Sequence, residues 1–127
     1  MKFEHFALNV LNPLELVKWY TSNCDMKIVK SIKVSPFTHF LADSSGRSVI
    51  EIYSNPSAKI PDYSMLHPLE FHIAFNVEDV NLIREKLISA GAKLLEDLTL
   101  EDGSHLVMLR DPFGIPLQLC KRATPLV

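Results

Sequence analysis

Residues 3–10 alternate between two kinds of side chain. One face of this segment is apolar and the other mixes apolar with polar groups, which predicts a half-buried β-strand. The apolar face consists of Phe6, Leu8 and Val10, and the mixed face of Phe3, His5, Ala7 and Asn9. A helix is predicted at about 13–23. It opens on Asn12–Pro13, and Leu14, Val17 and Tyr20 recur at helical spacing.

Three further strands complete the first half, and the second half repeats the order. The strands of the first half are expected at about 26–34, 37–43 and 48–54. In the second half, a strand at 69–77 leads to a helix at about 79–90 that ends at Gly91. Strands at about 93–97, 104–110 and 116–121 follow.

The two halves also resemble each other in sequence. The strand His5–Val10 matches His72–Val77 as H-x-A-x-N-V, at an offset of 67 residues (72 − 5 = 67). The same offset carries Glu51 onto Gln118 near the end of each half. Agreement at both ends indicates an internal duplication and argues against chance similarity of two amphipathic strands.

These patterns predict an α+β fold. We expect two tandem βαβββ modules that form a rolled mixed-sheet trough with the helices outside. Module 1 is predicted at about 1–54, a polar, proline-bearing linker at about 55–68 and module 2 at about 69–121, within a single domain of residues 1–127. A half of roughly 60 residues would bury only a thin core alone, so the two modules should pack side by side.

Strand alternation directs one metal-competent residue on each of four strands into the predicted trough. These residues are His5, Glu51, His72 and Gln118. Such a set of nitrogen and oxygen donors suits Zn, Ni, Co, Mn or Fe(II), and leaves coordination positions for water or substrate. Each residue alone has an ordinary structural explanation, such as a hydrogen-bonded core histidine. The internal symmetry that relates all four favours a divalent metal site.

Composition and charge argue against nucleic-acid and membrane partners, and a small-molecule substrate is the expected partner. The 127 residues carry a formal charge of −2 and no basic run, so neither nucleic acid nor a membrane surface is an expected partner. No apolar segment has the length of a membrane span. Cys24 and Cys120 lie far apart and match no zinc-site spacing, and reduced cysteines in a cytoplasmic protein are the simpler interpretation.

The sequence resembles the vicinal oxygen chelate superfamily, which contains glyoxalase I, bleomycin-resistance proteins and ring-cleaving dioxygenases. The resemblance covers essentially all of its length. It consists of the opening H-x-A-x-N-V, a central F-H-I-A-F and the ending D-P-F-G-I-P-L-Q-L, in paired βαβββ modules. It implies metal ligands at His5, Glu51, His72 and Gln118, with Glu51 the candidate catalytic base. Such motifs identify the fold more strongly than one activity.

Gln118 departs from the pattern of bacterial-type glyoxalase I, which the chain otherwise resembles. The four metal ligands of that enzyme are His, Glu, His and Glu, in chain order. An amide cannot accept a proton at neutral pH, which argues against ordinary glyoxalase I activity. In methylmalonyl-CoA epimerase, another member that the chain resembles, the four ligand positions have the order His, Gln, His, Glu. Exchanging the two halves of that order gives the order found here. The resemblance thus implies a metal-dependent lyase or isomerase in which Glu51 transfers a proton next to a carbonyl, through an enediolate-like intermediate.

Two alternatives stay open. One is a metal-free binding protein of the bleomycin-resistance type, which would bind its ligand in an aromatic trough. Candidates for lining this trough are Phe37, Phe40, Tyr53 and Tyr63. Two inward-facing histidines fit such a trough poorly. An Fe(II) extradiol-type dioxygenase would use His5, His72 and Glu51. In the ring-cleaving members, however, the carboxylate ligand lies on the last strand, where this chain has Gln118. Short members of the family pair their modules across a dimer, so the resemblance also implies a homodimer.

Other polar residues are not assigned to the site. His39 and His105 are 66 residues apart (105 − 39 = 66) and miss the repeat, so we expect them in solvent-facing or core positions. Arg110 has two open interpretations, binding of an acidic substrate or pairing with Asp111. Cys120 shares the inward parity of Gln118, but no base is placed beside it.

Overall fold

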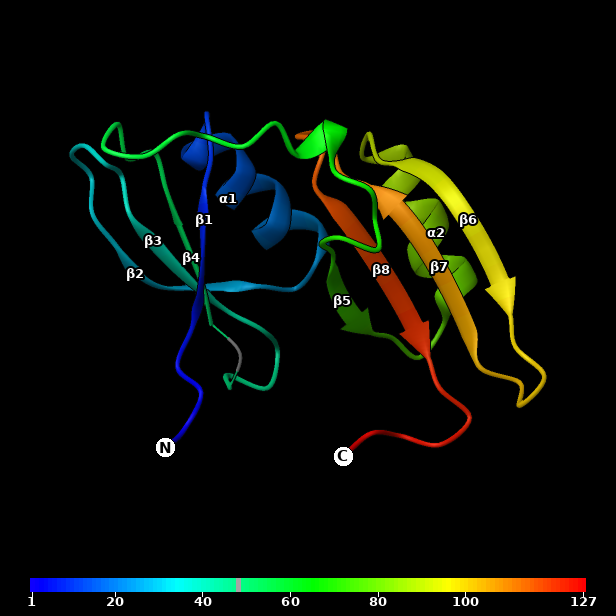
Figure 1. The fold of residues 1–127 in the computed structure, drawn as a ribbon. Coiled ribbons are helices and arrows are strands. Elements are labelled where there is room, and N and C mark those ends of the chain that lie inside the picture. The colour runs from blue at the N-terminus through cyan, green and yellow to red at the C-terminus, as the bar shows by residue number, and fades with distance from the viewer. Residues whose placement is uncertain (48) are drawn as a thin grey trace. The chain divides into compact units, whose positions relative to one another are not determined.

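The computed structural model describes residues 1–47 and 49–127 (Figure 1). The protein divides into two compact units, Met1–Pro61 and Asp62–Val127, and each is described by itself. The division falls inside the segment predicted as the linker. Each unit contains one four-stranded mixed sheet and one α-helix in βαβββ order, which confirms the predicted α+β class.

The first unit has its strands in the order β1-β4-β3-β2. β1 runs parallel to β4, and the other neighbours are antiparallel. Its elements are β1 (Phe6–Asn9), α1 (Pro13–Asn23), β2 (Lys27–Ser31), β3 (His39–Ala42) and β4 (Val49–Tyr53). The strands are shorter than predicted, so His5 lies just before β1. Residue 48, the predicted start of the last strand, lies outside the described residues.

The second unit has the same topology, with strand order β5-β8-β7-β6. β5 runs parallel to β8, and the remaining pairs are antiparallel. Its elements are a 3₁₀ turn η1 (Tyr63–Met65), β5 (Ile73–Asn76), α2 (Val80–Ser89), β6 (Lys93–Thr99), β7 (His105–Arg110) and β8 (Pro116–Lys121). The predicted strand at 69–77 is therefore reduced to its second half. The identical strand orders fit the duplication inferred from sequence.

Each helix covers one face of its own sheet (Figure 1). The buried stripe of α1 consists of Pro13, Leu16, Val17 and Tyr20. Leu14, which was predicted to face the sheet, is 53% exposed. Because Pro13 opens the helix and is buried, the stripe continues at 16, 17 and 20, and position 14 is rotated away from it.

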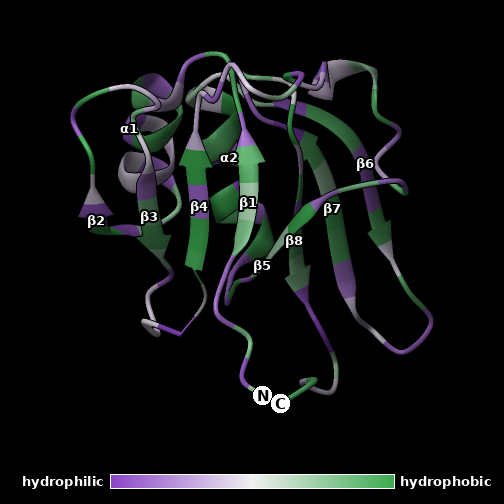
Figure 2. Cartoon of the chain, turned by 60° about the vertical axis from the view of Figure 1, so that its left-hand side comes forward, coloured by the Kyte–Doolittle hydropathy of each residue, from purple (hydrophilic) through white to green (hydrophobic). Residues whose placement is uncertain are grey.

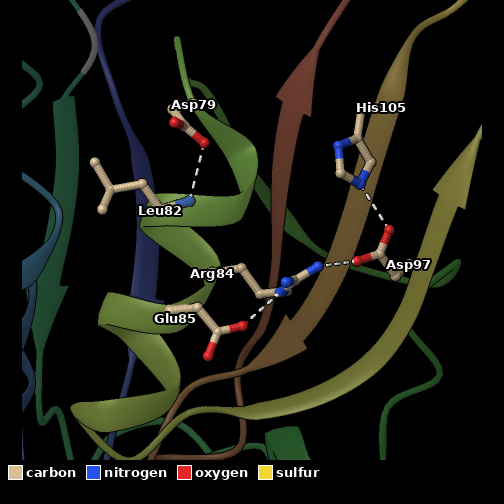
Figure 3. Close-up of polar contacts among 6 residues, drawn as sticks. All are labelled: Asp79, Leu82, Arg84, Glu85, Asp97 and His105. Carbon is tan, nitrogen blue, oxygen red and sulfur yellow. Dashed lines mark hydrogen bonds and ion pairs between the residues drawn. The ribbon is translucent and has the colours of Figure 1, made fainter.

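The two helices begin differently. Asn12 holds the N-cap position of α1, but its side chain makes no capping hydrogen bond, so only the position of the predicted cap is correct. Asp79 caps α2 with its side chain, which accepts a hydrogen bond from the backbone N–H of Leu82 at 3.0 Å (Figure 3). The α2 helix ends before Gly91, whose φ of +100° suits the predicted glycine.

Alternating burial along the strands places the functional side chains. Ile50 and Ile52 are 3% and 1% exposed under α1, and Glu51 between them points to the opposite face. Leu117 and Leu119 are equally buried and flank Gln118. In Figure 2 a hydrophilic band accordingly interrupts the hydrophobic colour of β4.

The D-P-F-G segment forms a tight turn between β7 and β8. Oδ1 of Asp111 accepts hydrogen bonds from the backbone N–H groups of Phe113 and Ile115 at 2.9 and 2.8 Å. Gly114 has a φ of +87° and lies against Ser64. The Arg110 guanidinium donates to the carbonyl oxygens of residues 63, 66 and 114, at 2.7–2.9 Å. The Arg110 guanidinium thus anchors the η1 segment.

Within the described residues, no helix has both the length and the apolar character required to span a membrane.

Candidate functional site

The first unit brings His5 and Glu51 together. Nε2 of His5 lies 3.3 Å from Oε2 of Glu51, and both side chains are partly exposed, at 31% and 21%. Ala7 pairs with Glu51 across β1 and β4, and His5 precedes Ala7 by two residues, so the two side chains share the face away from α1. The ring of Phe40 on β3 meets the His5 ring edge-on, with centroids 5.7 Å apart.

The other nitrogen of His5 is bound to a carboxylate. Its Nδ1 lies 2.5 Å from Oε2 of Glu4, and a carboxylate can only accept, so this nitrogen carries the proton. In a neutral imidazole, Nε2 then presents a lone pair toward an oxygen of Glu51. Two acceptors at 3.3 Å repel each other unless a proton or a metal ion lies between them.

His72 in the second unit shows the same division of its ring nitrogens. Its Nδ1 lies 2.8 Å from the carbonyl oxygen of Pro68, which is also only an acceptor. Nε2 of a neutral His72 is thus left with a lone pair for a ligand. The two histidines that the repeat relates therefore agree in a chemical detail as well as in position.

Gln118 is the fourth predicted residue. It pairs with Ala74 across β5 and β8, as Glu51 pairs with Ala7, so it lies on the face of its sheet that corresponds to that of Glu51. Its Oε1 accepts a hydrogen bond from the thiol of Cys120 at 3.1 Å. Burial raises the pKa of this thiol, which keeps it protonated and able to donate. Cys120 thus orients the amide oxygen of Gln118.

The donor atoms fit a divalent cation in their chemistry. Imidazole nitrogens with their second nitrogen tied to an oxygen, a carboxylate and an amide oxygen are ligands that zinc, nickel, cobalt, manganese and iron accept. Among the residues that the structure describes, no three His, Cys, Asp or Glu side chains form a group able to hold a metal ion. The structure therefore brings His5 and Glu51 into contact within the first unit. His72 and Gln118 are described only by their contacts within the second unit.

Glu4 is the residue of this cluster that the sequence analysis missed. Strand alternation predicts the face to which a side chain points, and within the predicted strand at 3–10 it places Glu4 on the face opposite His5, so it does not mark the two as partners. The available signal was the acidic residue directly before the histidine, because a carboxylate commonly binds the second nitrogen of a metal-ligating histidine.

His39 and His105, which were expected in solvent-facing or core positions, lie outside this cluster. His39 is 6% exposed, and its Nδ1 lies 2.7 Å from the carbonyl oxygen of Phe37, which makes it a hydrogen-bonded core residue. Nε2 of His105 on β7 lies 2.6 Å from Oδ1 of Asp97 on β6. The other oxygen of Asp97 binds Arg84 of α2 (Figure 3). The hydrogen bond from His105, with a smaller contribution from Arg84, lowers the pKa of Asp97.

The asparagine of the H-x-A-x-N-V motif has a structural role in the first unit. The Asn9 amide nitrogen donates to the carbonyl oxygens of Asn55 and Ala58 at 3.1 and 3.2 Å. Its oxygen accepts from the backbone N–H of Asn55 at 2.8 Å. Asn9 thus holds the segment that leaves β4 against β1.

Comparison with known proteins agrees with the fold and the motifs. A model of the Glyoxalase/Bleomycin resistance protein/Dioxygenase superfamily matches residues 2–119. The chain belongs to this superfamily. That match confirms the resemblance inferred from the sequence. No curated protein matches the chain.

Solved structures of superfamily proteins share the fold at low identity. A glyoxalase family protein from Bacillus cereus has a TM-score of 0.80 and 16% identity, over 94% of this chain and 93% of the other. One from Enterococcus faecalis has a TM-score of 0.70 and 20% identity, over 94% and 97%.

A mutant of the fosfomycin resistance protein FosX from Listeria monocytogenes is a further match. It has a TM-score of 0.73 and 16% identity, over 98% of this chain and 90% of the other. That protein was crystallised with Mn(II) and 1S,2S-dihydroxypropylphosphonic acid. At such identities these matches extend to the fold alone.

Proposed function

We propose that the protein is a metal-dependent lyase or isomerase that transfers a proton next to the carbonyl of a small-molecule substrate. The observation that supports it best is the state of the two histidines related by the repeat. In each histidine, Nδ1 is bound to an oxygen acceptor, which leaves Nε2 for a ligand. The Nε2 atom of His5 lies 3.3 Å from an oxygen of Glu51.

His5, Glu51, His72 and Gln118 would hold the ion. The ion would polarise the substrate carbonyl and so acidify the neighbouring C–H. The Glu51 carboxylate takes this proton, becomes a carboxylic acid and returns the proton to an adjacent carbon or to the same carbon. The Gln118 amide cannot accept a proton at neutral pH, so the Glu51 carboxylate performs both proton transfers.

Metal binding by purified protein tests the proposal. We expect about one divalent ion per protein molecule, measured by elemental analysis and by competition with a chromophoric chelator. His5→Ala and Glu51→Ala should lower the metal affinity by at least ~100-fold, because each removes a ligand. Glu4→Gln should lower it by ~10-fold, because it weakens only the partner of His5. His105→Ala, at a histidine that binds Asp97 outside the cluster, is the matched control.

Proton transfer is measured separately. NMR would follow deuterium uptake from solvent at the carbon next to the carbonyl of small 2-oxo compounds. Loss of the general base in Glu51→Gln should slow this exchange by ~10²–10⁴-fold. Absence of bound metal, with ligand binding unchanged in His5→Ala, would instead support a metal-free binding protein. Oxygen uptake with catechols after anaerobic loading with iron would support a dioxygenase.

A further inference from the structure

Two lysines of the edge strand β2 point to the same face of the first sheet. Residues three apart on a regular strand point to opposite faces. The pairing of β2 with β3 shifts around Val29, which forms a bulge, so Lys27 pairs with Ala42 and Lys30 with Phe40. Ala42 and Phe40 are two residues apart on β3 and share a face. The bulge therefore aims both lysines to one side.

That side is the face of His5 and Glu51. Phe40 pairs with Lys30 on one flank and with Glu51 on the other, so the three residues form a row across β2, β3 and β4. The Phe40 ring also contacts the His5 ring. Glu51 and Lys30 are two strand spacings apart, which is ~10 Å between their backbones. A flexible lysine can span part of this gap over the ring of Phe40.

Both lysines are available to a ligand. They are exposed, and among the described residues neither forms an ion pair with a carboxylate. Lysines also occur on edge strands because they discourage strand pairing between molecules. The second unit differs at these two positions. Its edge strand β6 has the same bulge, but Lys93 and Glu96 occupy the corresponding positions.

We propose that Lys27 and Lys30 bind the anionic group of the substrate on which His5 and Glu51 act. This inference rests on the proposed function and gives it a substrate class. The substrate is a small carbonyl compound with a carboxylate or phosphate, whose apolar section lies over Phe40. The backbone spacing and the reach of lysine put the anionic group roughly 4–8 Å from the reacting carbon. A lysine ammonium is a point charge that binds carboxylate and phosphate alike.

A matched pair of probes tests this assignment. Levulinate carries a ketone and a carboxylate, and methyl levulinate is the same molecule without the charge. NMR titration of the labelled protein would give the dissociation constant of each. Lys30→Gln should weaken levulinate binding by ~10-fold and Lys30→Glu by more, with methyl levulinate unchanged. Lys27→Gln should act in the same direction. Competition by inorganic phosphate tells whether the lysines also accept phosphate.

Lys93→Gln is the control variant, because it makes the same charge change at the corresponding position of the other unit. It should leave levulinate binding unchanged. The proposal is overturned if wild-type protein does not prefer levulinate, if the Lys30 variants weaken both probes equally, or if Lys93→Gln has the same effect. Metal content measured on the same samples reports on the proposed function independently. Metal binding without a levulinate preference refutes only this inference, and the preference without metal refutes only the metal site.

Discussion

At position 114 both the backbone conformation and the available space require glycine. Its φ is +87°, and a Cβ added there would lie 2.8 Å from the backbone nitrogen of Ser64. Gly46 has a similar φ of +74°, but an added Cβ would meet nothing within 4 Å. The two glycines therefore separate the cost of conformation from the cost of a steric clash.

We predict that Gly114→Ala lowers the free energy of unfolding by ~2–4 kcal/mol, because conformational strain and the clash with backbone add. Gly46→Ala should cost ~1 kcal/mol, because only the left-handed conformation is penalised. Urea unfolding followed by circular dichroism measures both. Equal losses would mean that the η1 segment moves away at little cost and that its anchoring by Arg110 is weak.

Among the candidate site residues, the chemistry of each side chain depends on its second partner. Glu4, Pro68 and Cys120 supply these partners to His5, His72 and Gln118. The sequence pattern identifies the face on which each of the three lies, because alternation along a strand is strict. It does not identify the partner, which depends on rotamers and on loops that have no periodicity.

At the scale of elements, Asp97 links α2 to the edge of the second sheet. Its two oxygens bind His105 of β7 and Arg84 of α2 (Figure 3). These contacts hold the pKa of Asp97 below its usual range. A carboxyl with a depressed pKa in the folded state contributes stability above its ordinary pKa of ~3.9. The contribution is lost as the pH falls through the folded value.

We predict that Asp97→Asn lowers the stability at pH 7 by ~0.5 kcal/mol, a small loss because the cluster is partly exposed to solvent. The difference from wild type should shrink as the pH falls from ~4 through the lowered pKa of folded Asp97, because the wild-type carboxylate is then protonated. Urea midpoints at several pH values measure it. Glu96→Gln, which neutralises the neighbouring residue on the opposite face of β6, is the control. A difference that does not depend on pH would exclude this electrostatic origin.

The elements themselves could be predicted from sequence where periodicity is strong. The helices at 13–23 and 79–90 and the burial around Glu51 and Gln118 follow from it. The errors have local causes. Periodicity alone did not show that buried Pro13 sets the rotation of α1, which turns Leu14 outward. The bulge at Val29 adds one residue to a strand, and no spacing rule predicts on which side Lys27 and Lys30 emerge.

At the scale of the whole molecule, two units of one topology carry different chemistry. The first unit has Glu51 with two lysines on the same face, and the second has Gln118 with one lysine and one glutamate at the corresponding positions. A duplication begins with two equal halves. Proton transfer needs one base, and recognition of an anion needs one positive edge. Under the proposed function, the first unit keeps the base and the positive edge, and the second contributes His72 and Gln118 as ligands.

The exposed edge of β6 suggests how complete molecules associate. All seven residues of this edge strand are exposed, and Leu94, Leu95 and Leu98 are 47%, 45% and 42% exposed. An edge strand that exposes leucines tends to pair with another molecule. We therefore predict a homodimer in sedimentation velocity experiments at micromolar concentration. Leu98→Lys should raise the dimer dissociation constant by at least ~10-fold, because it places a charge in a contact that excludes water. Leu82→Lys, at a 65% exposed position of α2, should not change it. A wild-type monomer over the whole concentration range would refute the prediction and would require the metal ligands to come from one molecule.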